Sequence, residues 1–187
     1  MYKNSYKKLK LNDLIKKAKT SDTNALEELI KRVQKNVYAV FFNLTEDKND
    51  VSDLTQLALI KMAKSIKNLR HPSGFHTWLN QIIITVYYDF IRKKGPELEY
   101  NEDKIKEIKD KLGCEPGEKC LFSEVENFIK ASLLSLPHQL RVSIILREFQ
   151  GLSYEDIAQI TNTTLGTVKS RISRARGKLQ KALKDFI

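Results

Sequence analysis

The sequence of 187 residues is poor in the residue types that small disulfide-rich or all-β domains need. It holds two cysteines, seven glycines and four prolines, too few turn-forming residues for the many tight turns of a β-sandwich. Two cysteines exclude a disulfide framework and suit a reducing compartment. No apolar run approaches the roughly 20 residues of a membrane span, and the basic N-terminus lacks the apolar stretch of a signal peptide. These absences predict a soluble, mainly helical, cytoplasmic protein.

The residue patterns of common enzyme and metal sites are also missing. His71, His76 and His138 are scattered, and Cys114 and Cys120 do not have the spacing of a zinc site. The glycines are isolated, so no phosphate-binding loop is expected. We therefore expect no catalytic residues, no metal, no cofactor and no small-molecule substrate; oxidation of the two cysteines to a disulfide remains an alternative.

The charge is strongly positive, with 33 lysines and arginines against 23 acidic residues and a net charge of +10. Such an excess is typically used to attract a polyanion, either nucleic acid or an acidic membrane. The hydrophobic content of 41% is enough for one core or two modest ones.

Apolar residues recur every three or four positions in the first half of the chain, which predicts amphipathic helices over 25–44, 54–69 and 75–90. Residues 82–86 alone would also fit a buried strand, but they stay in phase with Trp78 and Phe90, which favours helix. The candidate N-caps are Asp22 or Thr23 for the first helix and Asp50 or Ser52 for the second.

An acidic segment separates two helical modules. Residues 96–120 hold eight acidic residues and five lysines, a net charge of −3 in a basic protein. We interpret this segment as a linker, partly helical at 104–112. The fold class is therefore predicted to be all-α, with small helical domains at 1–95 and 121–187.

The C-terminal module has the pattern of a helix-turn-helix. Ser153 and Asp156 form a capping box, Asn162 suits a left-handed turn, and Thr164 can cap a second helix. From 165 to 187 there are seven cations against Asp185 alone. The polar residues off the apolar stripe are predicted to face a DNA major groove: Thr167, Lys169, Ser170, Arg171 and Arg174. The alternative is a solvated cationic helix face.

These motifs resemble a known family. The segment 133–183, with Gly166-Thr167-Val168-Lys169-Ser170-Arg171 followed by Arg174-Ala175-Arg176, resembles region 4 of bacterial RNA polymerase sigma factors. Residues 11–94, notably DVSDLTQLALIKMAKSI and FHTWLNQIIITVYYDFIRKK, resemble sigma region 2. Two such regions and no other are typical of the extracytoplasmic-function (ECF) group of the sigma-70 family.

The resemblance implies an alternative sigma factor that binds core RNA polymerase and directs it to promoter DNA. Region 4 would recognise the −35 element. The resemblance adds Arg176 to the residues predicted to contact DNA there, Thr167, Lys169, Ser170, Arg171 and Arg174. Region 2 would bind the clamp of the largest polymerase subunit; the matching residues are Asp50, Asp53, Leu54 and Gln56. Leu57 stands where the family usually has an acidic residue, and Asp50 and Asp53 are also suited to helix capping.

Region 2 would also open the −10 element and hold the exposed strand. The residues implied for this are Arg70, His71, Ser73, Asn80, Arg92, Lys93 and Lys94. Phe75 and Trp78 fit core packing or base stacking, and Thr85 replaces a common Asn. The linker would enter the active-site cleft of the polymerase, although a solvated spacer fits its composition equally well.

The resemblance further implies a cognate anti-sigma factor as a partner. Two other classes remain open from the residues alone. One is a freestanding, dimeric helix-turn-helix regulator. The other is an RNA-binding or nucleic-acid-processing enzyme, which would need clustered acidic residues for metal ions near the basic face.

Overall fold

The computed structural model describes residues 3–95 and 118–184, and the side chains of 5–95 and 125–184. All regular secondary structure in these ranges is helical. The chain divides into two compact units. The N-terminal unit comprises residues up to 42 together with 47–90, and the C-terminal unit comprises 43–46 together with the residues from 91 onward. The predicted linker, including its expected helix at 104–112, falls almost entirely outside the described residues.

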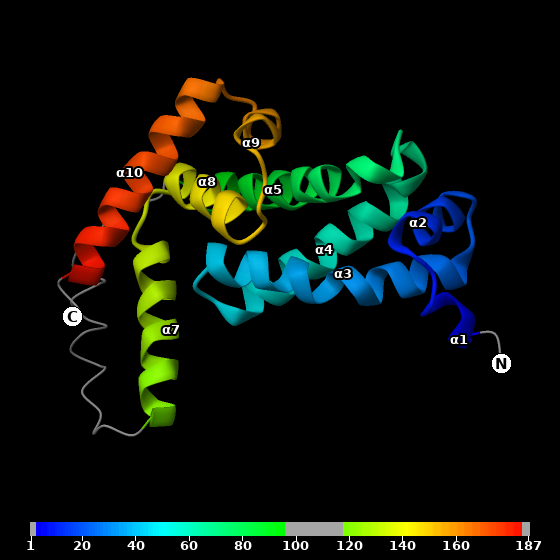
Figure 1. Ribbon diagram of the computed structural model, residues 1–187, viewed down its shortest axis with the longest axis horizontal. Helices are drawn as coiled ribbons and strands as arrows, with labels where there is room; N and C mark the ends of the chain where they lie inside the picture. The colour runs from blue at the N-terminus through cyan, green and yellow to red at the C-terminus, as the bar shows by residue number, and fades with distance from the viewer. Residues whose placement is uncertain (1–2, 96–117, 185–187) are drawn as a thin grey trace. The chain divides into compact units, whose positions relative to one another are not determined.

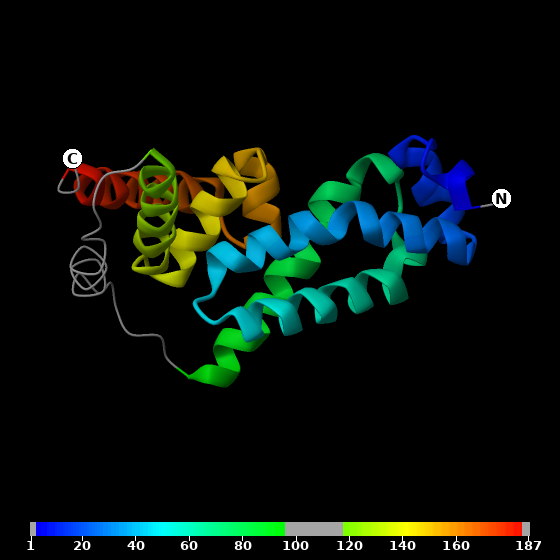
Figure 2. The ribbon, with the colours of Figure 1, turned by 90° about the horizontal axis from the view of Figure 1, so that it is seen from below.

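Three long helices form the body of the N-terminal part: α3 (Thr23–Leu44), α4 (Lys48–Ser65) and α5 (Phe75–Lys94). In Figure 2, α3 and α4 run side by side and α5 crosses them obliquely; Figure 1 shows the same three helices from another side. Two short 3-10 turns, η1 (Ile66–Asn68) and η2 (Pro72–Gly74), connect α4 to α5. The helix prediction for 82–86 is confirmed, because these residues lie inside α5.

Side-chain caps fix where two of these helices begin. The Asp22 carboxylate accepts the backbone N–H of Ala25 at 3.0 Å, as expected for the N-cap of α3. Helix α4 begins earlier than expected, because Asp47 caps it by accepting the N–H of Asn49 at 2.8 Å. Asp50 and Ser52 therefore lie inside the helix, and the prediction that one of them is the N-cap is wrong.

Two short helices precede this body: α1 (Lys3–Tyr6) and α2 (Leu11–Lys19). In α2, Leu14, Ile15 and Ala18 are buried and Leu11 is half-buried. Helix α2 packs against both 3-10 turns. This helix was not predicted from the sequence, although Leu11, Leu14, Ile15 and Ala18 have the i, i+3, i+4, i+7 spacing of an amphipathic helix.

The C-terminal unit contains α7 (Glu118–Leu134), α8 (His138–Glu148), α9 (Tyr154–Thr161) and α10 (Leu165–Lys184). Helix α10 packs against α7, α8 and α9. Among the described residues of this unit, Phe128 is the largest buried side chain, and the stripe Val168, Ile172 and Ala175 attaches α10 to the core. The all-α, two-module architecture expected from the sequence is thus confirmed.

Candidate nucleic-acid interface

The turn between α9 and α10 has the geometry that the sequence predicts. The Ser153 hydroxyl oxygen accepts the N–H of Asp156 at 3.0 Å and caps α9. Asn162 ends α9 in the left-handed conformation, with φ of 50° and ψ of 51°. The Thr164 hydroxyl oxygen accepts the N–H of Thr167 at 3.2 Å, which caps α10. Two helices are therefore held at a short, fixed turn, as in a DNA-binding helix-turn-helix.

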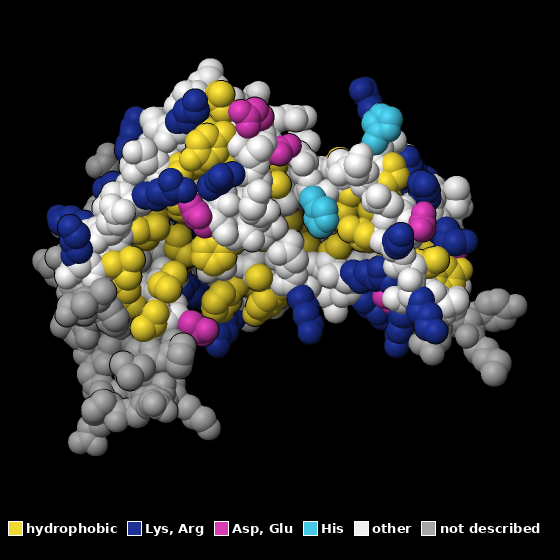
Figure 3. Space-filling model, viewed as in Figure 1, with side chains coloured by type: hydrophobic (Ala, Val, Ile, Leu, Met, Phe, Trp, Pro, Cys, Tyr) yellow, Lys and Arg dark blue, Asp and Glu magenta, His cyan; other side chains and the backbone are white. Residues whose placement is uncertain are grey.

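The buried stripe of α10 determines which of its side chains face outward. Val168, Ile172 and Ala175 are inside, so the opposite face of the helix points to solvent. The exposed side chains on that face include Ser173 and Arg174, and the exposed Lys169 lies at its flank, about 100° from Val168. Ser173 was not predicted from the sequence, although its distance from the apolar stripe would have identified it. Figure 3 shows Lys and Arg side chains along α10.

Two arginines of α10 are instead held by side chains of α8. The Arg171 guanidinium donates to the Gln139 amide oxygen at 2.7 Å. The Arg176 guanidinium forms an ion pair with Glu148 at 2.6 Å, which raises the pKa of Arg176. Since each helical residue turns by about 100°, Arg174 and Arg176 are separated by about 200° around the axis. Arg176 therefore faces α8, away from Arg174.

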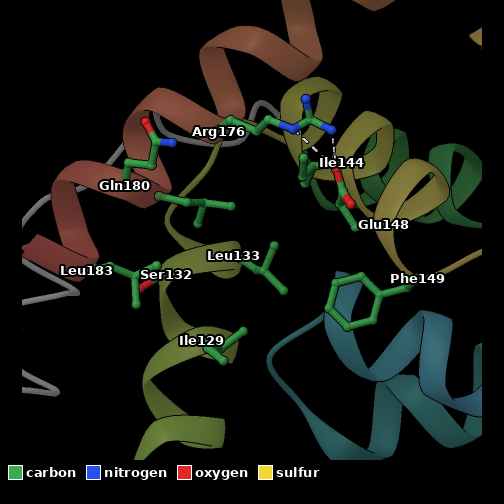
Figure 4. Close-up of a pocket in the computed structure, with 10 residues that line it drawn as sticks. Ile129, Ser132, Leu133, Ile144, Glu148, Phe149, Arg176, Gln180 and Leu183 are labelled. Carbon is green, nitrogen blue, oxygen red and sulfur yellow. Dashed lines mark hydrogen bonds and ion pairs between the residues drawn. The ribbon is translucent and has the colours of Figure 1, made fainter.

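An apolar pocket of about 430 Å³ lies beside this ion pair, between α7, α8 and α10 (Figure 4). Ile129 and Leu133 contribute from α7, Ile144 from α8, and Leu183 from α10. Phe149, which follows α8, is half exposed at its edge. Figure 3 shows apolar side chains gathered beside α7. The C-terminal unit thus presents a cationic surface and, separately, an apolar one.

The N-terminal unit places a short polar loop at its surface between η1 and α5. Arg70, His71 and Ser73 are exposed there. Phe75, the first residue of α5, is fully buried and Trp78 is half-buried, so core packing accounts for Phe75. Residues 92–94 are exposed in the last turn of α5, where cations are favoured by the carbonyl end of the helix.

Asn80 is not at this surface. Only 2% of the residue is exposed, and its side-chain amide donates to the carbonyl of His76 at 3.0 Å within α5. Its amide oxygen is buried and has no hydrogen-bond partner in the structure. The prediction that Asn80 donates a hydrogen bond to a base is therefore corrected, since the amide is buried and occupied.

Helix α4 carries the residues implied for polymerase binding. Asp53 and Gln56 are exposed on it and Asp50 is half-buried, but Leu54 is only 5% exposed and belongs to the core. Leu54 is therefore removed from the contact surface. Two apolar side chains lie exposed nearby in the sequence, Leu57 and Ile60, each 43% exposed. Ile60 was missed because an aliphatic residue within an amphipathic helix is normally assigned to its core.

Comparison with known proteins connects both units to one family. The family models described as sigma-70 region 2 and sigma-70 region 4 match residues 29–97 and 129–179. The ECF RNA polymerase sigma-E factor of Haemophilus influenzae is 32% identical over 182 residues, covering 93% of this chain and 95% of the relative. The RNA polymerase sigma-H factor of Pseudomonas aeruginosa is 30% identical over 186 residues, covering 93% and 94%.

The chain belongs to the sigma-70 family of RNA polymerase sigma factors. The ECF relatives make it an alternative sigma factor, which directs transcription initiation. A freestanding regulator is not favoured, because region 2 is present as well as region 4.

Two solved structures agree with this sigma-factor fold. The sigma factor RpoE of Bartonella quintana, solved with the anti-sigma factor NepR, matches with a TM-score of 0.63 and 28% identity over 84% of this chain and 96% of that chain. CnrH, solved with the cytosolic domain of CnrY, has a TM-score of 0.67 over 94% of this chain and 97% of that chain, at 18% identity, and supports the fold alone.

The described residues of this sigma factor contain neither a candidate metal site nor a candidate membrane-spanning helix. Within 3–95 and 118–184, no group of three or more His, Cys, Asp or Glu side chains is placed to hold a metal ion. In the same ranges, no helix has the length and apolar character to cross a membrane.

Proposed function

We propose that the two modules of this sigma factor divide promoter recognition between them. Residues 1–95 act as region 2, 96–120 as the linker and 121–187 as region 4. The observation that carries the proposal is the outward face of α10, which is cationic and opposite the buried stripe of a capped helix-turn-helix. A major groove admits such a helix, and its base edges pair with arginine, lysine and hydroxyl groups.

The −35 element is recognised by a subset of the predicted residues. Lys169 and Arg174 are exposed, and Thr167 and Ser170 are half-buried beside them. Arg171 lies at the edge of this face and must release Gln139 to reach DNA. We exclude Arg176, because its ion pair with Glu148 directs it to α8.

The −10 element is held by the loop between η1 and α5 and by the end of α5. Arg70, His71 and Ser73 are exposed in the loop and contact an unstacked base. The cations at 92–94 neutralise phosphates of the separated strand. The free energy for strand opening comes from these contacts. We therefore propose that the protein lends specificity to the polymerase and catalyses no reaction itself.

Two protein partners complete the proposal. Asp53 and Gln56 bind the clamp of core RNA polymerase, together with the exposed Leu57 and Ile60. The second partner is a cognate anti-sigma factor, by analogy with the Bartonella quintana complex; we propose the apolar pocket of the C-terminal unit as its site, because this pocket is the exposed apolar surface described above. With these partners, we propose a cytoplasmic location for the protein.

The test is to combine the full chain with purified core RNA polymerase. We expect co-elution in size-exclusion chromatography and discrete transcription start sites on genomic fragments. Asp53→Lys should weaken co-elution, while the control Asp13→Lys, an exposed acid of α2, should not. The proposal is overturned if the unaltered chain neither co-elutes nor initiates transcription.

A further inference from the structure

Lys19, the last residue of α2, is bonded to the loop that carries Arg70, His71 and Ser73. Its ammonium group donates hydrogen bonds to the backbone carbonyls of Leu69 and Arg70, the second at 3.5 Å. These carbonyls lie 50 and 51 residues further along the chain. Helix α2 also packs against η1, which precedes the loop, and against η2, which contains Ser73 and forms the second half of the loop. The start of the loop is thus held by a side chain from a distant helix.

The bonded carbonyls lie where the backbone lacks helical partners. Helix α4 continues into η1, which ends at Asn68, and Leu69 follows in an extended conformation with φ of −63° and ψ of 118°. Carbonyls at the end of a helix have no intrahelical donor and carry partial negative charge, which favours a cation. One ammonium has three donors, so it can hold two successive carbonyls. This contact fixes the orientation of the peptide groups from which the exposed Arg70 and His71 side chains leave.

Lys19 is itself firmly placed. The buried Leu14, Ile15 and Ala18 attach α2 to the core. At the beginning of α2, the chain is held by Arg32 of α3. The Arg32 guanidinium donates to the carbonyls of Leu9 at 2.8 Å and Tyr6 at 3.0 Å, which precede α2 in the chain. Helix α2 is therefore tied to α3 at its beginning and to the loop at its end. It lies outside the segment 29–97 that matches region 2.

We propose that Lys19 is a positioning residue for capture of the −10 strand: it holds loop 69–74 in the conformation that presents Arg70, His71 and Ser73 to an unstacked base. This inference rests on the proposed function. Lys19 does not touch DNA itself in this role. Loss of its ammonium group should weaken binding of single-stranded DNA and leave polymerase binding and −35 recognition unchanged.

The experiment uses holoenzyme assembled from the full chain and core RNA polymerase. The probe is a fluorescent single-stranded oligonucleotide with the non-template −10 sequence of a promoter mapped by in vitro transcription. Lys19→Met keeps the aliphatic stem but removes both bonds. It should weaken probe binding about tenfold, as expected if the binding-competent conformation of the loop falls to about a tenth of the population. Lys19→Arg should restore most of the affinity. Lys16→Met, an exposed lysine one turn earlier in α2, is the matched control and should bind as the unaltered chain does.

Two further measurements test whether Lys19 positions the loop, only stabilises the fold, or contacts the DNA directly. Val37→Ala removes a buried methyl pair in α3 and supplies a destabilised chain with the loop contact intact; it should bind the probe normally at temperatures below its unfolding transition. A positioning role leaves the salt dependence of probe binding unchanged in Lys19→Met. A fall of about 0.7 in the slope of log K against log salt would make Lys19 a phosphate ligand and overturn the inference.

The inference is also overturned if Lys19→Met binds the probe as well as Lys16→Met does, or if Val37→Ala reproduces its defect. In both cases the unaltered holoenzyme still forms and initiates transcription. Failure of the unaltered chain to bind core polymerase is a different result, which overturns the proposed function and the inference with it.

Discussion

Replacing Arg174 and Arg176 separately tests the assignment of the DNA-facing side of α10. The two residues are both arginines, both exposed and only two positions apart. Among the described residues, Arg174 has no hydrogen-bond or ion-pair partner, whereas Arg176 is paired with Glu148 at 2.6 Å. Arg174→Ala should therefore remove a contact made only in the DNA complex, and Arg176→Ala a contact made only within the protein.

The expected effects differ in size. An arginine that forms two hydrogen bonds with a base contributes about 1–3 kcal/mol of discrimination, so Arg174→Ala should reduce promoter selection by roughly 5- to 150-fold. The Arg176–Glu148 pair is about half exposed on both sides, and such pairs contribute about 0–1 kcal/mol to stability. Arg176→Ala should therefore change promoter selection by less than about twofold and lower the unfolding temperature only slightly.

The assay is competitive transcription by the holoenzyme from two templates, one with its native −35 element and one with that element replaced. The ratio of the two transcripts measures discrimination and cancels differences in active protein. Arg174→Lys separates charge from geometry, because lysine keeps the phosphate attraction but loses the planar fork. An Arg176→Ala defect equal to or larger than that of Arg174→Ala would show that the outward face has been assigned to the wrong side of α10.

Three further predictions concern the folded chain. The pKa of Asp22 is lowered mainly by the hydrogen bond from the Ala25 N–H and further by the one from the Tyr6 hydroxyl. The capping contribution of Asp22 is therefore complete above the ordinary pKa of 3.8 and is lost as pH falls through the lower pKa of the folded state. The unfolding temperature should drop below about pH 4, and it should drop less in Asp22→Asn. Asn162→Val should destabilise the C-terminal unit by about 1–2 kcal/mol, because a β-branched residue is strained in the left-handed conformation, while Asn162→Gly should be nearly neutral in urea denaturation followed by circular dichroism. Asn80→Ala removes one helix-internal hydrogen bond together with a buried oxygen that lacks a partner, so its free energy of unfolding, followed by Trp78 fluorescence, should change by less than about 1 kcal/mol.

The local signals in the sequence predicted the helix-turn-helix well. Ser153, Asn162 and Thr164 each act on backbone groups within three or four residues, so the residue type nearly determines the geometry. The helix at 82–86 was also predictable, because the residues before and after it keep a helical period. Such features depend on short stretches of chain and need no knowledge of tertiary contacts.

The features that the sequence did not predict depend on neighbours far along the chain. Asn80 and Leu54 were assigned to surfaces by resemblance, but burial is decided by what packs over them. Arg176 was grouped with the DNA-facing cations because its partner, Glu148, lies 28 residues away. Lys19 lay in an unremarkable basic segment, and its bond to Leu69 spans 50 residues. The partner of a charged side chain cannot be identified from the sequence when it lies far along the chain, because only the fold brings the two together.

The C-terminal unit shows why a count of cations overstates the charge available to DNA. The glutamate and glutamine of α8 that hold Arg176 and Arg171 lie on the helix against which α10 packs. Each pairing withdraws a guanidinium from the outward face at little cost, because both contacts are exposed and both ends remain partly hydrated. The exposed cations that remain in the first half of α10, Lys169 and Arg174, lie about 140° apart around the axis of α10, with the small residues Ser170 and Ser173 between them. Both long side chains can reach base edges only if the groove encloses more than a third of the circumference of the helix. The arrangement therefore favours a helix seated deeply in the major groove, with Ser170 and Ser173 nearest its floor.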